Sequence, residues 1–515
     1  MRGSSRLLKG LGTQWPVAVL AAGTFLVFAG GLGNGFAAED YDWLFASSLD
    51  APLLLRLIAR SARLRPLSLL LGWLGYRVWG ADPWAWHGLI LALHILCSLG
   101  VFSLTKRLLR ETNVALLATA LFSVYPRHHQ AVLWLAANQF VLSGVGILFT
   151  LILYVRYLRT GKLRFYLLTW ALAVGALAAQ EVGAVVFPLM FLTEVLIRAG
   201  ERSGSSIRQV LLSPRTYLKY APVLLLLTLF LVLTFGGDRS FKLRPTVVDP
   251  RAEMETYHFV GLNGELVKTF AAYVVYLVFP QVPLRTLDVS GYTIALTLMV
   301  VTGLLAVFVL GWRFERYCLL WMVGTLLPFV LFVPFGNADR YFYLPAVGHS
   351  MLLAALARRL WRFLRGRWGR AVRAAAIGVL VLYLASAVIL TQQRTAEWRR
   401  AGDIVEEVIL QVRELYPEVP RESQMFFVGL PGWYGQAYVF QGGGIGGAVR
   451  MAYQDLRLEV YRSMDPELAR WLAAQEEGEH TPGRYAFLYE GGEIRDVSAR
   501  VRDFEDFYES WWWYR

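Results

Sequence analysis

Apolar stretches of about 20 residues recur from residue 15 to residue 390 and then stop. Inside a bilayer no water is available to the backbone, so only a segment with internal hydrogen bonds, such as a helix, can cross it. A soluble chain of 515 residues would instead divide into two or three domains with largely polar surfaces. The pattern therefore predicts an α-helical polytopic membrane protein and excludes a large soluble enzyme.

Clusters of arginine and lysine between the apolar stretches indicate how the chain crosses the membrane, because such clusters concentrate in cytoplasmic loops. They place the N-terminus in the cytoplasm. We expect about eleven spanning helices, at 15–34, 84–105, 113–125, 138–158, 165–180, 182–197, 220–236, 291–311, 317–335, 341–357 and 372–390. Residues 266–283 are apolar enough to span, but a span there would put the arginine-rich segment 358–373 on the wrong side. We therefore expect a re-entrant or surface-lying helix there, on the outer face.

The charge divides unevenly along the chain. The net charge is +13, made up of +20 in residues 1–390 and −7 in residues 391–515. Basic residues confined to short loops indicate orientation in the cell membrane and not nucleic-acid binding. We expect a transmembrane domain of residues 1–390 and a small soluble α/β domain of residues 391–515, which the odd span count places outside the cytoplasm.

Within the second domain we expect a helix over 395–416, strands at 424–429, 456–461 and 485–489, and a hairpin turn at Gly491–Gly492. The glycines at 442–444 and 446–447 lack the lysine of a phosphate-binding loop, so we interpret them as a flexible loop. The aromatic residues Trp511–Tyr514 are expected either at the lipid headgroups or packed inside the domain. Cys97 and Cys318 lie in separate apolar stretches and predict no disulfide.

An acidic loop follows the first span, with Glu39, Asp40 and Asp42 close together. Neighbouring carboxylates repel one another and raise a pKa, which suits a general base. The Asp40-x-Asp42 spacing alternatively suits oxygen ligands of a divalent cation, and a solvated acidic loop is the third interpretation. After this loop, residues 53–65 form an amphipathic, arginine-bearing stretch that we expect along the membrane interface.

Four motifs in order resemble the glycosyltransferase C-fold superfamily, in the branch of the protein O-mannosyltransferases and their bacterial relatives. They are the acidic loop with its interface stretch, Arg65-Pro66-Leu67 and His87 to His94; the turn 121–132 with Tyr125-Pro126-Arg127-His128-His129; the corner Ala179-Gln180-Glu181; and the loop Asp339-Arg340-Tyr341-Phe342-Tyr343-Leu344-Pro345. The resemblance covers residues 15–390. The chain departs from the branch in having Glu39-Asp40 where two aspartates are usual, which leaves the choice of base between them open.

The resemblance implies a membrane enzyme that transfers a sugar from a polyprenyl-phosphate donor to an acceptor hydroxyl of a protein, lipid or glycan at the outer face, with inversion. Asp40 or Glu39 would be the base. Arg340 would bind the donor phosphate, with Arg127 and His128 assisting and Tyr341 and Tyr343 flanking the headgroup. His87, His94, Glu181 and Asp42 would support the site, and the need for a metal stays open.

Two other functions remain open. A non-catalytic or transport protein would place charges along a path through the bilayer, whereas here they gather at one surface and no internal repeat is evident. A polysaccharide polymerase or ligase that uses a lipid-linked donor typically has a large outer loop rich in arginine and histidine. The longest outer loop here, 237–265, is modest.

Overall fold

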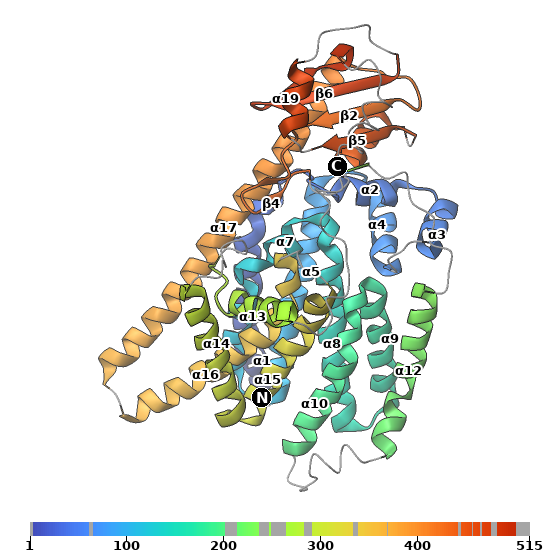
Figure 1. Cartoon of the computed structure of the whole chain (residues 1–515). Coiled ribbons are helices and arrows are strands. Elements are labelled where there is room, and N and C mark those ends of the chain that lie inside the picture. The colour runs from blue at the N-terminus through green and yellow to red at the C-terminus, as the bar shows by residue number, and fades with distance from the viewer. Residues whose placement is uncertain are drawn as a thin grey trace.

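The computed structural model describes residues 4–60, 65–200, 214–235, 247–248, 264–282, 291–332, 338–367, 369–440, 444–455, 457–463, 466–474 and 482–500. A bundle of helices carries a small sheet at one end (Figure 1). Most of the predicted outer loop 237–265 and the whole of Trp511–Tyr514 lie outside these described residues.

The long helices of the bundle are α1 (Ser4–Phe28), α5 (Pro83–Leu109), α6 (Thr112–Ser123), α8 (Asn138–Thr160), α9 (Leu163–Ala179), α10 (Val186–Gly200), α12 (Pro214–Phe235), α13 (Gly264–Val278), α14 (Gly291–Leu310), α15 (Arg313–Phe332), α16 (Pro345–Arg367) and α17 (Arg370–Leu415). A helix occupies most of each of the eleven ranges expected to span. Four helices in the described part of the chain are long and apolar enough to cross a membrane, within 83–109, 135–160, 313–331 and 370–415, and several shorter helices are apolar. The count of eleven spans remains a prediction.

Local sequence explains where several of these helices begin and end. At α5 the Asp82 side chain accepts the Trp84 N–H at 3.0 Å, and Pro83 occupies the first turn, where its missing N–H costs nothing. The helix α8 ends at Gly161 in the left-handed conformation that glycine adopts freely. Pro345 likewise begins α16, so the predicted start at residue 341 is wrong. Residues 339–342 instead form the 3₁₀ helix η5 (Asp339–Phe342).

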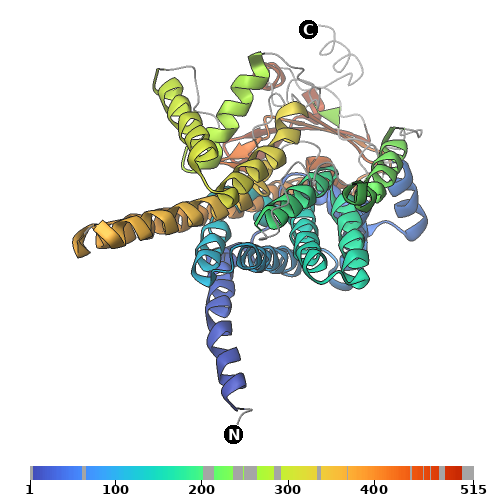
Figure 2. The same cartoon turned by 90° about the horizontal axis from the view of Figure 1, so that it is seen from below.

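The segment 264–278 behaves differently from its neighbours. Helix α13 lies across the direction of α8 in Figure 1 and packs against α14 and α15. Helix α17 also stands apart, because it runs unbroken for 46 residues from the arginine-rich segment into the C-terminal sheet. The predicted boundary at 390/391 therefore falls inside one helix. Figure 2 shows α1 projecting from the bundle in one direction and the arm formed by α16 and the start of α17 projecting in another.

The loop after α1 folds into three short helices, α2 (Asp40–Ser48), α3 (Ala51–Arg60) and α4 (Pro66–Trp79). The predicted interface stretch 53–65 is helical as far as it is described, up to Arg60, and residues 61–64 lie outside the described residues. Helix α4 was not predicted. Helix α4 packs against α2 and α9. The Arg77 guanidinium fastens α4 to the end of α2, where it donates to the Ser47 and Leu49 carbonyls at 3.1 and 2.6 Å.

A five-stranded sheet forms the C-terminal end, in the order β1 (Val247–Val248), β5 (Glu459–Ser463), β2 (Gln424–Val428), β6 (Arg484–Glu490) and β7 (Glu493–Asp496). The pairs are parallel except β6–β7, which are joined by Gly491 and Gly492, both at positive φ. The three predicted strands and the hairpin are confirmed. The unpredicted strand β1 comes from the segment 237–265, so residues before 390 help to build this sheet.

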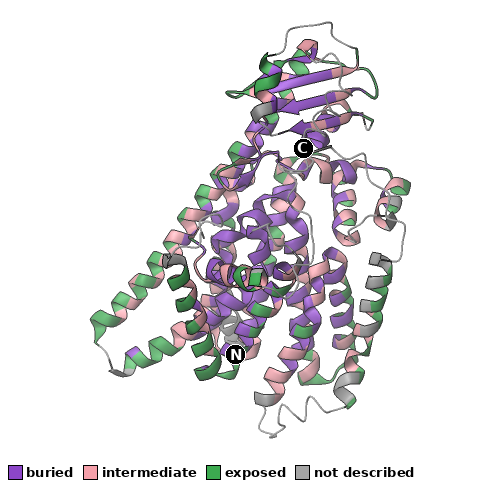
Figure 3. Ribbon diagram, in the orientation of Figure 1, coloured by how far each residue is buried: buried purple, intermediate pink, exposed green. Residues whose placement is uncertain are grey.

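Successive side chains along each strand point to opposite faces of the sheet, and both faces are buried. Met425, Phe427 and Phe487 belong to the same apolar core as the helix bundle, whereas Phe426, Val428 and Leu488 pack with α19 (Pro466–Ala474) in a second cluster. Figure 3 shows the continuous buried interior running from the bundle into the sheet. The C-terminal part is thus packed onto the bundle on one face and is not a freely tethered unit.

Candidate active site

The acidic loop is buried where α2 begins. Asp40 is 1% exposed, and its carboxylate accepts hydrogen bonds from the Ala37 N–H at 3.1 Å and the Ala136 N–H at 2.7 Å. Burial raises the pKa of Asp40 well above its usual value, and the neighbouring Glu39 adds to the rise, while the two N–H donors oppose it. The prediction of a solvated acidic loop is therefore wrong for Asp40.

Glu39 and Asp42 flank this carboxylate. Glu39 is half-buried at the N-cap of α2, and its carbonyl accepts the Trp43 N–H at 2.9 Å. Burial raises the pKa of Asp42 to about 8, with a further contribution from Glu39, and Arg450 partly offsets it. Glu39 thus raises the pKa of both Asp40 and Asp42, and the three carboxyl groups lie close together at one end of the bundle.

Helix α18 (Gly444–Tyr453) covers this cluster through its glycines. A Cβ atom at Gly444 would lie 2.3 Å from the Ala38 carbonyl oxygen, and one at Gly447 would lie 2.5 Å from the Asp42 nitrogen. Only glycine permits so close an approach of two backbones. The prediction of a flexible loop is wrong for Gly444–Gly447, which form the buried first turn of this helix; residues 442 and 443 lie outside the described chain.

The turn after α6 forms a second cluster, η2 (Pro126–His128) followed by α7 (His129–Leu133). The Arg127 guanidinium donates to the Asp339 carboxylate at 2.5 Å and to the Tyr276 and Val282 carbonyls at 3.0 and 2.5 Å. Arg127 is therefore bound to protein groups on three sides. This arrangement favours a role in bracing the turn over the predicted role at the donor phosphate.

His129 also binds the Asp339 carboxylate, although the sequence motif predicted no role for it. Its Nε2 lies 2.6 Å from Asp339, and its Nδ1 accepts the Trp398 indole N–H at 2.9 Å. Because Nδ1 accepts a hydrogen bond, the proton must be on Nε2, and the imidazole is neutral. Burial alone would raise the pKa of Asp339, but Arg127 and His129 outweigh it and hold the pKa well below its usual value.

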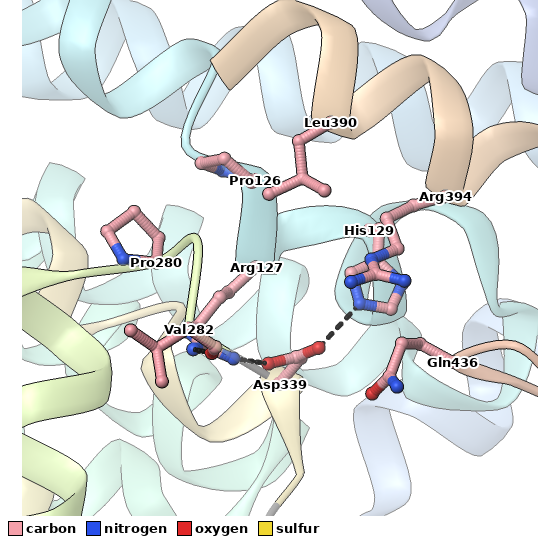
Figure 4. Close-up of a pocket in the computed structure, with 9 residues that line it drawn as sticks. All are labelled: Pro126, Arg127, His129, Pro280, Val282, Asp339, Leu390, Arg394 and Gln436. Carbon is pink, nitrogen blue, oxygen red and sulfur yellow. Dashed lines mark hydrogen bonds and ion pairs between the residues drawn. The ribbon is translucent and has the colours of Figure 1, made fainter. Parts of the chain in front are cut away.

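Arg127 and His129 approach the Asp339 carboxylate from opposite sides in Figure 4. These three residues line a cavity of about 10 Å³, room for about one water molecule. The rest of the lining comes from Pro126, Pro280, Val282, Leu390, Arg394 and Gln436. The cavity therefore lies where the turn, the η5 loop, α17 and the C-terminal segment meet.

His128 points elsewhere, into an aromatic cluster. Its ring centroid lies 5.2 Å from that of His94, 4.6 Å from that of Phe122 and 4.7 Å from that of Tyr343. His94 Nδ1 in turn bonds the Tyr343 hydroxyl at 2.9 Å. Burial lowers the pKa of His128 well below its usual value, so the ring is neutral. The structure brings His94, His128 and Tyr343 together inside the bundle, so Tyr343 does not flank Arg340 as expected.

Arg340 is 7% exposed and lies among aromatic rings. The carbon at the centre of its guanidinium is 5.0 Å from the Trp134 ring centroid, 4.9 Å from that of Tyr341 and 5.9 Å from that of Tyr438. Its nitrogens make long contacts of 3.3 to 3.4 Å to Gln130, Tyr438 and Tyr341. The carboxylate of Asp339, the residue before Arg340, binds Arg127 and His129 instead. We call the set of rings around the Arg340 guanidinium, from Trp134, Tyr341 and Tyr438, the Arg340 cage.

Two of the predicted supporting residues, Glu181 and His87, have other partners than Arg340. Two nitrogens of the Arg65 guanidinium, Nε and Nη2, lie 3.1 and 3.0 Å from the same carboxylate oxygen of Glu181. This ion pair joins two of the sequence motifs. His87 is buried and stacks on Phe36 in the acidic loop, at a ring-centroid distance of 6.3 Å. Among the residues that the structure describes, no three metal-binding side chains gather as a ligand set.

One short segment connects the acid with the arginine. Ala136 donates its N–H to Asp40, and Trp134, two residues earlier, lies against the Arg340 guanidinium. Residues 135–137 form the 3₁₀ helix η3 (Leu135–Ala137) at the start of α8. Asp40 and Arg340 therefore both contact residues 134–136, at the end of the bundle that carries the sheet.

No family model matches the chain. It is 24% identical over 314 residues to a protein O-mannosyl-transferase of Caenorhabditis elegans, covering 58% of this chain and 42% of that protein. It is 30% identical over 143 residues to the protein O-mannosyl-transferase Tmtc1 of Drosophila melanogaster, covering 28% of this chain and 17% of that protein. The predicted resemblance to the protein O-mannosyltransferases is confirmed. The chain spans less than half the length of either relative.

Solved structures of two membrane enzymes match over most of the chain at low identity. ArnT from Cupriavidus metallidurans, bound to undecaprenyl phosphate, has a TM-score of 0.49 and 13% identity, and the match covers 92% of this chain and 93% of ArnT. The oligosaccharyltransferase AglB from Archaeoglobus fulgidus has a TM-score of 0.47 and 11% identity, with 96% of this chain and 75% of AglB covered.

Proposed function

We propose that this protein is a multi-pass cell-membrane glycosyltransferase. It transfers a sugar from a polyprenyl-phosphate donor to a hydroxyl group at the outer face, with inversion at the anomeric carbon. The names of its two curated relatives suggest mannose as the sugar and protein as the acceptor. The helix bundle holds the donor, and the C-terminal α/β region lies outside the cytoplasm.

The observation that carries this proposal is that a buried carboxylate and a buried guanidinium both contact the short segment 134–136. Asp40 is fixed by the Ala136 N–H, and Arg340 lies over the Trp134 ring. Inverting transfer needs a base on the acceptor side of the anomeric carbon and a cation on the leaving-group side. An acid and an arginine that both contact one short segment meet that requirement.

The proposed reaction is a single displacement. The acceptor oxygen attacks the anomeric carbon, its proton passes to the Asp40 carboxylate, and the bond from the anomeric carbon to the phosphate oxygen breaks. The polyprenyl phosphate leaves with the electron pair, and the Arg340 guanidinium stabilises the charge that develops on it. A raised pKa makes Asp40 a stronger base once it is ionised, and the Ala37 and Ala136 N–H groups favour that ionised form.

The remaining predicted residues take supporting roles in this scheme. Arg127 braces the turn through Asp339, and Tyr341 forms one wall of the Arg340 cage. Glu39 raises the pKa of Asp40 and of Asp42 through its charge, and Asp42 is the residue on which a divalent cation would depend. Chelation that abolishes transfer, with recovery on adding back a divalent ion, would assign that second role.

The proposal is tested with the purified full-length chain in nanodiscs, supplied with polyprenyl-phosphate [¹⁴C]mannose and a mixture of serine- and threonine-containing peptides. The expected result is release of polyprenyl phosphate together with label on the peptides, as the α-anomer if the donor is β-linked. Other polyprenyl-phosphate hexoses and pentoses extend the donor panel. No release of polyprenyl phosphate from any donor, with a folded protein, would refute the proposed function.

A further inference from the structure

The third wall of the Arg340 cage comes from the C-terminal part of the chain. Tyr438 lies on β4 (Ala437–Tyr438), which pairs with β3 (Trp433–Tyr434) in a separate two-stranded hairpin. The Tyr438 hydroxyl lies 3.3 Å from Arg340 Nη1, and its ring packs edge-on against Trp134 at 5.2 Å. The sequence motifs that carry the resemblance all lie before residue 390, so they give no role to Tyr438.

This hairpin is fastened at both ends to the parts of the chain that build the site. On α17, the Glu397 carboxylate accepts the Gln436 N–H at 2.8 Å. One residue beyond Tyr438, the Val439 carbonyl accepts the Ala38 N–H at 2.8 Å, two residues before Asp40. A segment of four residues, 436–439, therefore contacts both the acidic loop and the arginine.

The contacts of Arg340 described here suit the exchange of partners. Gln130, Tyr438 and Tyr341 are uncharged, and their contacts of 3.3 to 3.4 Å are longer than the usual 2.9 Å or so. A phosphate oxygen would form shorter, charge-assisted bonds to the same nitrogens. The ring faces meanwhile stabilise the cation and fix the plane of the guanidinium without neutralising it.

We infer that Tyr438 is a positioning residue for the lipid phosphate: it holds the Arg340 guanidinium in place before the donor binds and gives up its hydroxyl contact to the phosphate when the donor arrives. This inference rests on the proposed function. It makes the C-terminal hairpin part of the donor site. It also predicts that the hairpin affects donor binding more than the chemical step.

The variants are Tyr438→Ala, Tyr438→Phe and Arg340→Ala, with Tyr434→Ala as the matched control. Tyr434 lies in the same hairpin, but its side chain is 46% exposed. The measurements are equilibrium binding of polyprenyl monophosphate to the full chain in nanodiscs, KM for the donor, kcat and thermal stability. We expect Tyr438→Ala to weaken lipid-phosphate binding and raise the donor KM by about 5- to 30-fold, with kcat within about threefold of wild type.

Tyr438→Phe retains the ring and should bind within about threefold of wild type, and Tyr434→Ala should match wild type. If Tyr438→Ala binds as wild type while Arg340→Ala loses binding, the positioning role is refuted and the proposed function stands. If kcat and thermal stability fall in Tyr438→Ala without a change in KM, the residue is only structural and the inference is equally refuted. If Arg340→Ala also binds as wild type, the phosphate site of the proposed function is refuted together with this inference.

Discussion

Replacing Asp40 with asparagine tests the proposed base most directly. The carboxylate accepts two backbone hydrogen bonds, from Ala37 and Ala136, in a site that is 1% exposed. An asparagine offers one oxygen, so one N–H would face the amide NH₂ group and lose its partner. An unsatisfied buried donor costs about 1–3 kcal/mol of folding free energy. We therefore expect Asp40→Asn to fold, with reduced thermal stability.

The loss of activity should be larger than this stability cost. Removing a general base lowers the rate by roughly 10²–10⁴-fold, which corresponds to about 3–5 kcal/mol of activation free energy. The raised pKa of Asp40 adds a qualitative prediction. Because the base must be ionised, wild-type kcat/KM should rise with pH through the pKa of Asp40, whereas the residual rate of Asp40→Asn should not follow that rise.

The assay is release of polyprenyl phosphate over a range of donor concentrations, which gives kcat and kcat/KM, measured from pH 5 to pH 9 for wild type, Asp40→Asn and Asp50→Asn. Asp50 is an exposed acid in the same loop whose carboxylate accepts the Leu53 N–H at 3.0 Å, so it controls for loss of one charge. Wild-type activity is expected for Asp50→Asn. A rate within about tenfold of wild type for a folded Asp40→Asn would be too small for loss of the base and would move that role to Glu39.

Three further changes test other parts of the site, and a fourth tests topology. Arg340→Ala should weaken donor binding by roughly 10- to 150-fold, the loss of one charge-assisted hydrogen bond, and Arg340→Lys should recover part of it; equal binding by all three proteins would remove Arg340 from the site. Gly447→Ala should lower kcat without a matching change in donor KM, because its Cβ would lie 2.5 Å from the Asp42 nitrogen; unchanged kinetics would show that α18 can shift harmlessly. Because the pKa of Asp42 is raised to about 8 in the folded protein, ionising Asp42 costs more in the folded than in the unfolded chain. The free energy of unfolding should therefore fall as the pH rises from about 4 through 8, and Asp42→Asn should flatten that fall in thermal melts. A reporter active only in the cytoplasm should work when inserted in 358–373 and be silent when fused after Arg515; the opposite pattern would contradict the outer placement of the site.

The positions of the helices could be predicted because lipid imposes a length and a composition on every crossing segment. The hairpin at Gly491–Gly492 was predictable for a similar reason, since a two-residue turn needs residues that accept positive φ. The continuity of α17 was not predictable. Its sequence changes from apolar to polar near residue 390, and that change looks like a domain boundary although the backbone remains helical.

Which residues carry the site was also partly predictable. Asp40 and Arg340 stand out in sequence because a charged group at a membrane surface must be solvated or paired, and both are found at the same end of the bundle. Their partners were not predictable. Asp339 adjoins Arg340 in sequence, yet its carboxylate binds Arg127 and His129, more than 200 residues earlier in the chain. Neighbours in a 3₁₀ turn point in different directions, so adjacency says little about pairing.

The C-terminal contribution shows where such reasoning stops. Tyr438 is one of 25 tyrosines, and nothing in the residues around it distinguishes it from Tyr434, four residues earlier on the paired strand β3. Only the packing of the hairpin against residues 38 and 134 separates them, because it buries one ring beside a guanidinium and leaves the other in solvent. A ring stabilises a cation only within about 6 Å of it. In the proposed function, the site for the lipid phosphate is therefore built from three distant segments brought together, and we expect substitutions in the hairpin to alter donor binding while every motif in the membrane bundle stays intact.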